Sequence, residues 1–362
     1  MQSDRKDGLS VAISIIFRFN RTVRWVSQSL SRVYRRATPK HNRMQSSTKY
    51  RGRFAPSPTG PLHFGSLVAA LGSYLDAKHY HGTWLVRIED LDTPRCVAGA
   101  ADDILRTLEA FGLYWDEEVI YQSQRTAAYE EALHKLQESG AAYPCCCTRR
   151  EIADSALHGI EGPVYPGTCR NGIPAGREAR AWRLGTDLVR YPHFCGNNNI
   201  QNSAEVIEFD DALQGHITQN LKCDIGDFVV KRADGLFAYQ LAVVVDDAFQ
   251  NITHVVRGAD LLHSTPRQIY LQELLGLPTL IYLHLPIVVN ARGEKLGKQT
   301  LASPIDKNDA AATLFDALVF LNQRPPAELR FSKVEEVLVW AVTHWQPDLI
   351  LEKRVVRESH DI

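Results

Sequence analysis

Residues Arg53 to Leu67 read RFAPSPTGPLHFGSL, and the chain continues with VAALGSYLDAKHY, which is apolar at helical spacing. Three prolines make the first stretch rigid, while Gly60 and Gly65 allow the backbone to approach a ligand closely. The helix that follows offers unpaired N–H groups and the positive end of its dipole, which suits phosphate. His63 can donate hydrogen bonds to phosphate oxygens as charge develops on them. This stretch therefore predicts a phosphate-binding turn at the start of a helix.

Strand and helix patterns alternate after this turn. A short strand ends at Pro56, because proline cannot donate to a strand ladder. The alternation predicts an α/β fold with a parallel, doubly wound sheet. Between Gly226 and Leu261 we expect strands around the turn RADG and then a buried apolar run. The other expected elements are helices at Ser66 to about Tyr80, Ala98–Phe111, Arg125–Ser139 and Ser264–Gly276, and strands at Thr83–Asp90 and Thr279–Asn290.

The composition is that of a soluble globular protein. A chain of 362 residues is long enough for two or three domains. It contains no run of about 18 apolar residues, so we expect no membrane span. Seven cysteines, three of them adjacent, do not resemble a secreted disulfide scaffold. We therefore expect a cytoplasmic protein.

The first 50 residues differ in charge from the rest. They carry eleven Lys and Arg against two Asp, a charge of +9, so the remainder carries −10 of the total of −1. A targeting peptide or an RNA-binding arm would have this composition. We favour the alternative that Met44 is the true start, because MQSSTKYRGRF begins only a few residues before the first strand. No fold or activity is inferred from residues 1–43.

A second basic motif lies far along the chain. KLGKQ places Lys295 and Lys298 on a polar loop that follows an apolar strand. A mobile lysine can clamp the phosphates of a nucleotide during transfer and then release them. A lysine loop by itself is usually only solvated. Its occurrence after the histidine turn, separated from it by a sheet, favours a site of nucleotide chemistry.

These motifs together resemble a known family. PLHFGSL is similar to the HIGH signature of class I aminoacyl-tRNA synthetases, and KLGKQ is similar to their KMSKS loop. RFAPSPTGPLHFGSL, VRIEDLDTPR, GLFAYQLAVVVDD and VVRGADLL resemble the glutamyl branch of that class. The CCC…YPGTC stretch resembles the truncated members of this branch, which act on tRNA(Asp). The resemblance covers roughly Arg51 to Thr300 and implies a Rossmann-like catalytic domain.

The resemblance implies a glutamate pocket and an ATP site. Glu89 is expected to meet the ammonium group and two arginines the carboxylates, although a salt bridge from Glu89 to Arg87 is the simpler alternative. Gly297 departs from the serine usual in the lysine loop, so we expect slower activation. The implied catalytic residues are His63 and Lys298; the glutamate ligands are Arg53, Phe54, Ala55, Pro56, Ser57, Glu89, Tyr239 and Arg257; the ATP ligands are His63, Gly65, Ser66, Lys295 and Lys298, with Mg²⁺.

The cysteine-rich stretch predicts a metal site. Cys145 and Cys147 form a C-x-C pair, and three thiolates with one further ligand would close a tetrahedral structural zinc site. The family match implies that Cys145, Cys147, Tyr165 and Cys169 bind one structural Zn²⁺. Because tyrosine is an unusual ligand, His158 and Cys146 remain as substitutes, and three buried thiols without metal are the alternative.

The resemblance also implies a division into domains. An extension at residues 1–50 precedes the first half of the catalytic domain at 51–142, and a zinc-binding insertion at 143–200 follows. The second half, with the lysine loop, spans 201–300, and a helical C-terminal region spans 301–362. About sixty residues follow the lysine loop, which we expect to be too few for an anticodon-binding domain. A monomer is the default expectation, because no feature of the sequence bears on assembly.

The expected reaction is therefore a ligation in two steps. Glutamate and ATP form glutamyl-adenylate without tRNA, and glutamate is then esterified to the queuosine base at the wobble position of tRNA(Asp). The first alternative is a truncated enzyme that charges the 3′ end of tRNA(Glu) or tRNA(Gln). A catalytically inactive RNA-binding module and a nucleotidyltransferase acting on a small molecule are further alternatives.

Overall fold

A computed structural model describes residues 49–153, 158–160, 162–186, 206–290, 292–296, 303–351 and 355–357. The chain divides into two compact units, Met1–Thr48 and Lys49–Ile362, and every described residue belongs to the second. The basic extension, with the expected start at Met44, lies outside the described residues. Lys298 and Gly297 of the lysine loop also lie outside them.

The first half of the central sheet consists of three short parallel strands. β1 (Arg51–Phe54) pairs with β2 (Thr83–Ile88), and β2 pairs with β3 (Ile120–Tyr121). Helix α2 (Phe64–His79) carries the chain from β1 to β2. It begins two residues earlier than the expected Ser66, because the residue before Phe64 caps the helix.

The second half of the sheet lies on the other side of β1. β11 (His254–Gly258) and β12 (Ile281–Leu285) are parallel, and α8 (Thr265–Leu275) connects them. β12 is followed by β8 (Val206–Asp211), also parallel, and then by β9 (Gly215–Asn220), which is antiparallel to β8. An antiparallel edge therefore completes an otherwise parallel arrangement.

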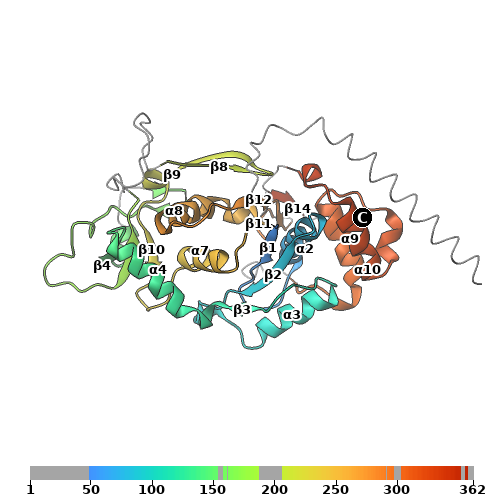
Figure 1. Ribbon diagram of the computed structural model, residues 1–362, viewed down its shortest axis with the longest axis horizontal. Coiled ribbons are helices and arrows are strands. Elements are labelled where there is room, and N and C mark those ends of the chain that lie inside the picture. The colour runs from blue at the N-terminus through green and yellow to red at the C-terminus, as the bar shows by residue number, and fades with distance from the viewer. Residues whose placement is uncertain are drawn as a thin grey trace, which may run out of the picture. The chain divides into compact units, whose positions relative to one another are not determined.

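The two halves of the sheet meet along β1 and β11 (Figure 1). The backbone N–H of Thr253 donates to the carbonyl of Arg51 over 2.9 Å, so the spatial order is β3-β2-β1-β11-β12-β8-β9. The chain winds away from this junction in both directions, which confirms the predicted parallel, doubly wound sheet. In such sheets ligands bind beyond the carboxyl ends of the strands at the point where the winding reverses.

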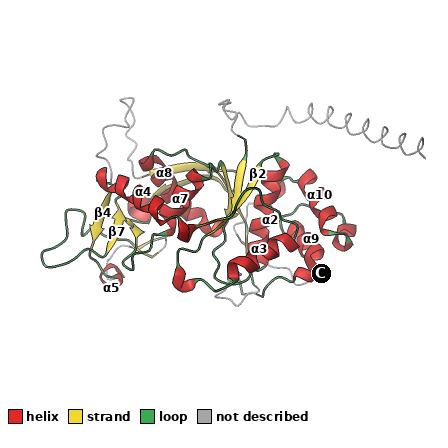
Figure 2. Cartoon of the chain, turned by 60° about the horizontal axis from the view of Figure 1, so that its bottom comes forward, coloured by secondary structure: helices red, strands yellow, loops and turns green. Residues whose placement is uncertain are grey.

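Helices cover both faces of the sheet (Figures 1 and 2). Successive side chains of a strand point to opposite faces, and on β2 Trp84 and Val86 enter one core while Leu85 enters the other. The first core contains residues of α2, α3 (Ala100–Ala110), α9 (Ala310–Phe320) and α10 (Val334–His344), and the second contains residues of α4 (Thr126–Glu138), α7 (Tyr239–Phe249) and α8.

The cysteine-rich stretch is built around a small antiparallel sheet. β7 (Ala181–Leu184) lies between β4 (Ala142–Cys145) and β10 (Phe228–Lys231). Ala142, Leu184, Phe228 and Val230 of this sheet are buried in the second core. A separate third cluster consists of Cys145, Cys146, Cys169 and Tyr165. This cluster has too few apolar side chains to act as an ordinary hydrophobic core. The remaining short elements are α5 (Arg149–Ala153), β5 (His158–Gly159), β6 (Gly162–Pro163) and α6 (Leu221–Asp224).

Three expectations from the sequence were wrong in detail. Tyr239, expected on a strand, is the first residue of helix α7, because the apolar run after it packs as a helix against α8 and α4. The strand expected at Thr279–Asn290 is broken at Pro286 into β12 and β13 (Ile287–Val289). The C-terminal region is not wholly helical, since β14 (Val355–Arg357) pairs in parallel with β13.

No helix within the described part of the chain is both long and apolar enough to cross a membrane.

A buried carboxylate connects the C-terminal helices to the sheet domain. Asp76 on α2 accepts hydrogen bonds from the hydroxyl of Tyr50 at 2.5 Å and the indole N–H of Trp345 at 2.9 Å. It thus joins the residue before β1, helix α2 and the end of α10 in a water-poor environment.

Replacing Asp76 by Ala is expected to lower the free energy of unfolding by about 2–4 kcal/mol, because two buried donors lose their acceptor. Urea denaturation measures this loss. Asp76→Asn retains an acceptor oxygen and should lose clearly less. An equal loss for Asp348→Ala, at an exposed carboxylate of the C-terminal region, would show that the effect does not come from this contact.

Candidate active site

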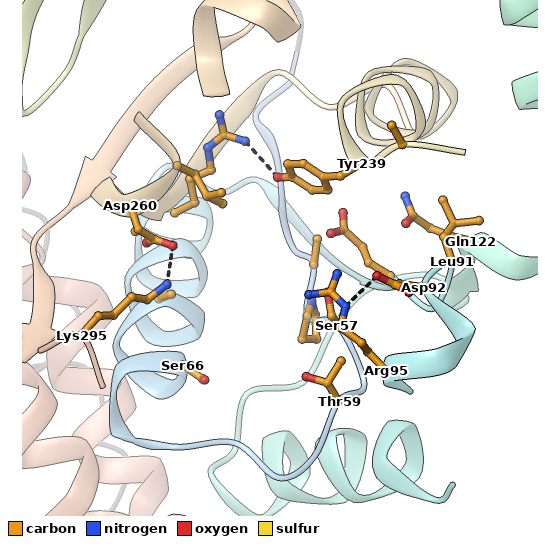
Figure 3. A pocket seen from close by; sticks show the side chains of 18 of the residues that line it. Ser57, Thr59, Ser66, Leu91, Asp92, Arg95, Gln122, Tyr239, Asp260 and Lys295 are labelled. Carbon is orange, nitrogen blue, oxygen red and sulfur yellow. Dashed lines mark hydrogen bonds and ion pairs between the residues drawn. The ribbon is translucent and has the colours of Figure 1, made fainter. Parts of the chain in front are cut away.

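A cavity of about 1510 Å³ lies beyond the carboxyl ends of β1 and β11 (Figure 3). It occupies the place where the sheet topology predicts a ligand. The structure brings to it all the expected glutamate ligands and those expected ATP ligands that are described. Its lining includes Arg53, Phe54, Ala55, Pro56, Ser57, His63, Gly65, Ser66, Glu89, Tyr239, Arg257 and Lys295.

His63 is the N-terminal cap of α2. Its Nδ1 accepts a hydrogen bond from the backbone N–H of Ser66 at 3.2 Å. Because Nδ1 accepts, the proton of the neutral ring is on Nε2, and that nitrogen is a donor. Gly65 leaves room for this arrangement, since a Cβ atom there would lie 3.3 Å from the imidazole. The turn therefore combines an imidazole donor with the amino-terminal end of a helix dipole.

Lys295 lies at the same end of the cavity. Its ammonium group forms an ion pair with Asp260 at 2.5 Å, as Figure 3 shows. Asp260 belongs to the short 3-10 helix Ala259–Ser264 that follows β11. To contact a phosphate group, Lys295 must therefore exchange one anionic partner for another.

Arg53 is held by a buried carboxylate on α7. Asp247 accepts from Nε and Nη2 of Arg53 at 3.1 and 3.2 Å, and from Nη1 of Arg87 at 2.7 Å. Burial opposes the charge on Asp247, but the two guanidinium groups outweigh it and lower the pKa of the carboxyl. Two cations and one anion are thereby locked together beneath the cavity floor.

Glu89 forms the salt bridge to Arg87 that was the simpler alternative, and it also faces the cavity. Its carboxylate lies 3.2 Å from Nη2 of Arg87. Its backbone N–H donates to the carbonyl of Pro56 at 3.0 Å, which fixes the end of β2 against the turn. Burial raises the pKa of Glu89, while Arg87 and Arg53 act in the opposite direction.

Arg257 approaches the cavity from the end of β11. Its Nη1 lies 3.4 Å from the hydroxyl of Tyr239, which is labelled in Figure 3. Behind Arg257, away from the cavity lining, lies His284, which contacts Asp211 at 2.6 Å. The cavity thus has one arginine from each half of the sheet, Arg53 and Arg257. The carboxylate of Glu89 lines it as well.

The sequence analysis missed the residues that hold the side chains of the cavity in place. Asp247, Asp211 and His284 were not singled out, and Arg87 was considered only as a partner of Glu89. One signal could have indicated His284: it is a polar residue that interrupts the apolar strand sequence IYLHL. The partners of these residues lie far away in sequence, so the run itself does not reveal them.

The cysteine-rich sheet gathers three thiols that could hold a metal ion. The sulfur atoms of Cys145, Cys147 and Cys169 lie within 4.8 Å of one another, and Cys147 and Cys169 are 3.7 Å apart. Ligands on a tetrahedral zinc ion lie about 3.8 Å apart when each bond is about 2.3 Å. The Tyr165 hydroxyl is 3.4 Å from Cys145 and 3.6 Å from Cys147, which fits the fourth corner.

Without a metal ion the Tyr165 hydroxyl is neutral, because burial and its hydrogen bonds with the cysteines raise its pKa. The backbone N–H of Cys169 donates to it at 2.9 Å, and the guanidinium of Arg183 lies 4.0 Å from the centre of its ring. Arg183 also donates to the sulfur of Cys145 at 3.3 Å. Three thiol groups and a phenol oxygen at these distances fit a dication, whose charge would favour deprotonation of its ligands. Cys146, the expected substitute, lies 3.6 Å from Cys169, while the side chain of the other substitute, His158, lies outside the described residues.

Comparison with known proteins gives the family. Residues 49–339 match the model of the catalytic domain of class I tRNA synthetases (E and Q). The chain belongs to this family. The resemblance drawn from the HIGH-like and KMSKS-like motifs is therefore confirmed.

Several similar members of the family carry one name. The glutamyl-Q tRNA(Asp) synthetase of Dechloromonas aromatica (strain RCB) is 57% identical over 312 residues, which are 86% of this chain and 98% of that protein. The glutamyl-Q tRNA(Asp) synthetase of Aromatoleum aromaticum is 55% identical over 296 residues, 82% of this chain and 89% of that protein.

Solved structures share the fold. The glutamate-tRNA synthetase from Elizabethkingia anophelis has a TM-score of 0.67 at 23% identity, over 86% of this chain and 68% of that chain. A glutamate tRNA ligase from Elizabethkingia meningosepticum, solved in complex with its amino acid, has a TM-score of 0.66 at 24% identity, over 86% and 67%. At these identities the similarity shows a common fold.

Single replacement of Cys145, Cys147 or Cys169 by Ser is expected to lower the metal content of the purified protein from one ion per chain towards none, because each change removes one corner of the site. Elemental analysis by mass spectrometry measures this. Cys146→Ser is the matched control from the same cluster. Metal lost in Cys146→Ser but retained in Cys147→Ser would contradict this ligand set.

The His284–Asp211 pair predicts a pH dependence of stability. Burial lowers the pKa of His284 to about 4, although Asp211 opposes this, whereas the unfolded imidazole titrates near about 6.5. Between these values the unfolded chain binds a proton that the folded chain does not, so stability falls as pH falls from about 6.5 to 4. Arg257 and Asp260 are the other charged groups acting on the ring.

His284→Gln should therefore show a shallower loss of stability over this interval, with the difference in slope approaching one proton. Urea midpoints of both proteins between pH 7 and pH 4.5 measure it. Parallel curves for the two proteins would contradict the assignment. In the wild type Asp211 titrates below this window, since the hydrogen bond with His284 lowers its pKa despite burial.

Proposed function

We propose that the chain activates L-glutamate with ATP, without tRNA, and transfers the glutamyl group to the queuosine base at the wobble position of tRNA(Asp). The observation that carries this proposal is the 57% identity with a protein named glutamyl-Q tRNA(Asp) synthetase, which extends over 98% of that protein. The two glutamate-tRNA synthetase structures compared above are much less similar, at 23% and 24% identity. The chain is thus an enzyme, a ligase of the aminoacyl-tRNA synthetase type.

The charges along the cavity support glutamate as the amino acid. Free glutamate has two carboxylates and one ammonium group. Arg53 and Arg257 supply two guanidinium groups, and Glu89 supplies one carboxylate, so the set is complementary to the amino acid. Glu89 meets the ammonium group, and the two arginines meet the carboxylates. The turn from Phe54 to Ser57 lines the same cavity and contributes backbone and hydroxyl contacts.

The other end of the cavity supports ATP. The α-carboxylate of glutamate attacks the α-phosphate, and pyrophosphate leaves. His63 and the N–H groups at the start of α2 stabilise the charge that develops on phosphate oxygens, and Lys295 and Lys298 act on the same phosphates. Mg²⁺ bound with ATP supplies further charge neutralisation. Positioning and electrostatics account for this step.

The transfer step needs room for a nucleotide base beside the activated carbonyl. The cavity lining includes Glu89 and Tyr239 and also Cys147, Arg149 and Arg180 of the cysteine-rich stretch. A cyclopentenediol hydroxyl of queuosine attacks the carbonyl of glutamyl-adenylate there. Its proton passes to a phosphate oxygen of the departing AMP, so that AMP leaves and the ester forms.

A structural zinc ion fits the cysteine cluster. Cys145, Cys147, Tyr165 and Cys169 would hold it, and three thiolates are the ligands that zinc prefers in closed structural sites. When bound, the ion supplies stability to the loops around this cluster, which has few apolar side chains. Because Cys147 and Arg149 line the cavity, the cysteine-rich stretch shapes the part of the site that meets tRNA.

Charging with labelled glutamate tests the proposal. Purified tRNA(Asp) with and without queuosine is incubated with the enzyme and ATP, and nuclease mapping then locates the label. We expect label only on the queuosine-bearing tRNA and only in its anticodon loop. Periodate treatment is a poor substitute for mapping, because it attacks the diol of queuosine as well as the 3′ end.

Label at the 3′ end of tRNA(Glu) would instead make the chain a truncated glutamyl-tRNA synthetase, and the proposal would be wrong. Glutamate-dependent exchange of pyrophosphate into ATP in the absence of tRNA tests the first step separately. Its absence would exclude tRNA-independent activation.

A further inference from the structure

His284 stands out among the buried residues because an imidazole occupies the middle of an apolar strand. It lies on β12 between Leu283 and Leu285, its exposed fraction is 0%, and it does not line the cavity. A polar ring in such a place costs free energy unless its nitrogens are paired. Both of them are. Nδ1 lies 2.6 Å from Asp211, and Nε2 lies 3.1 Å from Nε of Arg257.

The partners fix the state of the ring. The Nε group of Arg257 can only donate, so Nε2 of His284 must accept from it. The proton of the neutral ring is then on Nδ1 and points to the carboxylate of Asp211. Asp211 is itself held by backbone N–H groups, those of Leu213 at 3.0 Å and Gln214 at 2.8 Å. The ring is thus locked in one tautomer and one orientation.

A second contact holds the same edge of the guanidinium. Nη2 of Arg257 donates to the hydroxyl of Thr265 at 2.7 Å, and that hydroxyl lies 3.1 Å from Nε2 of His284. Thr265 is the first residue of α8 and is fully buried. The Nε–Nη2 edge of Arg257 is therefore occupied by neutral partners. The Nη1 end remains directed at Tyr239 in the cavity.

The two arginines of the cavity are held in different ways. Arg53 is bound directly by the carboxylate of Asp247, whereas Arg257 meets the carboxylate of Asp211 only through a neutral imidazole. A neutral acceptor orients a guanidinium without neutralising it by direct ion pairing. The positive charge of Arg257 is therefore less compensated by neighbouring anions than that of an arginine in a direct salt bridge, and it attracts a substrate carboxylate more strongly.

We propose that the Asp211–His284 pair, with Thr265, is a positioning device that orients Arg257 for one carboxylate of the bound amino acid. None of these three residues lines the cavity, so each acts through Arg257. The inference rests on the proposed function, because it takes glutamate as the ligand of Arg257. It goes beyond that function in assigning three buried residues to substrate affinity.

Two substitutions at the same position separate positioning from packing. In His284→Gln the side-chain oxygen can reach the place of Nε2 and accept from Arg257. In His284→Asn the shorter amide can reach Asp211 but not Arg257. Glutamate-dependent pyrophosphate exchange, measured over a range of glutamate and ATP concentrations, gives KM and kcat for each variant. Urea denaturation gives their stabilities.

We expect His284→Asn to raise the KM for glutamate by about 10- to 100-fold, as the loss of a hydrogen bond to a charged group does, with the KM for ATP unchanged. His284→Gln should recover most of this loss. Tyr282→Phe is the matched control on the same strand, because it loses the hydrogen bond with Gln272 but keeps its ring beside Arg257. It should leave the KM for glutamate unchanged.

Equal KM values for glutamate in the wild type and both variants would overturn the inference while leaving the proposed function intact. So would an equal rise in both variants, since that would indicate packing alone. If the Asn variant does not fold, Thr265→Ala and Thr265→Ser make the same comparison at Nη2, and only Ala should raise the KM. No exchange by the wild type would instead overturn the proposed function and this inference with it.

Discussion

The structure depends on the junction of β1 with β11. A single backbone hydrogen bond from Thr253 to Arg51 marks the line where two half-sheets, about 200 residues apart in sequence, become one. Because the chain winds outward from this line in both directions, the carboxyl ends of both strands face one crevice. Arg53 and Arg257 come from these two strands. Moving the junction by one strand would separate them.

Buried charge is the cost of this arrangement, and the fold offsets it by pairing arginines of β1 and β2 with an aspartate of α7. Beneath the cavity Arg53 and Arg87 share Asp247, and Arg87 also contacts Glu89, so cations and anions alternate. Such clusters are stable only when every member is paired, because a lone buried charge is strongly unfavourable. The same pairing holds each side chain in one orientation, so the charges that would bind glutamate are in place before glutamate arrives.

The cysteine-rich stretch is stabilised in a different way. The sheet itself packs into the second core, but the cluster of Cys145, Cys146, Cys169 and Tyr165 has few apolar side chains, so a metal ion would link the loops around this cluster. Asp227 at the start of β10 adds a polar anchor, since it pairs with Arg170 and accepts from Thr186. A segment held in this way can keep its part of the cavity lining, Cys147, Arg149 and Arg180, in a fixed shape.

The sequence alone determined the fold class and the residues of the site. Proline, glycine and histidine in the turn after Phe54 predict a phosphate site whatever surrounds them, because their chemistry is local, and the motifs gave the family. The spacing of Cys145 and Cys147 likewise indicates metal ligands without knowledge of the fold.

Only the tertiary structure decided how these residues are held. Tyr239 begins a helix because its apolar run packs against α4 and α8, which no local pattern reveals. Asp211 and His284 are 73 positions apart and meet only when β8 pairs with β12. A side chain that acts through another depends on distances across the sheet, and such distances are set by strand order rather than by neighbouring residues.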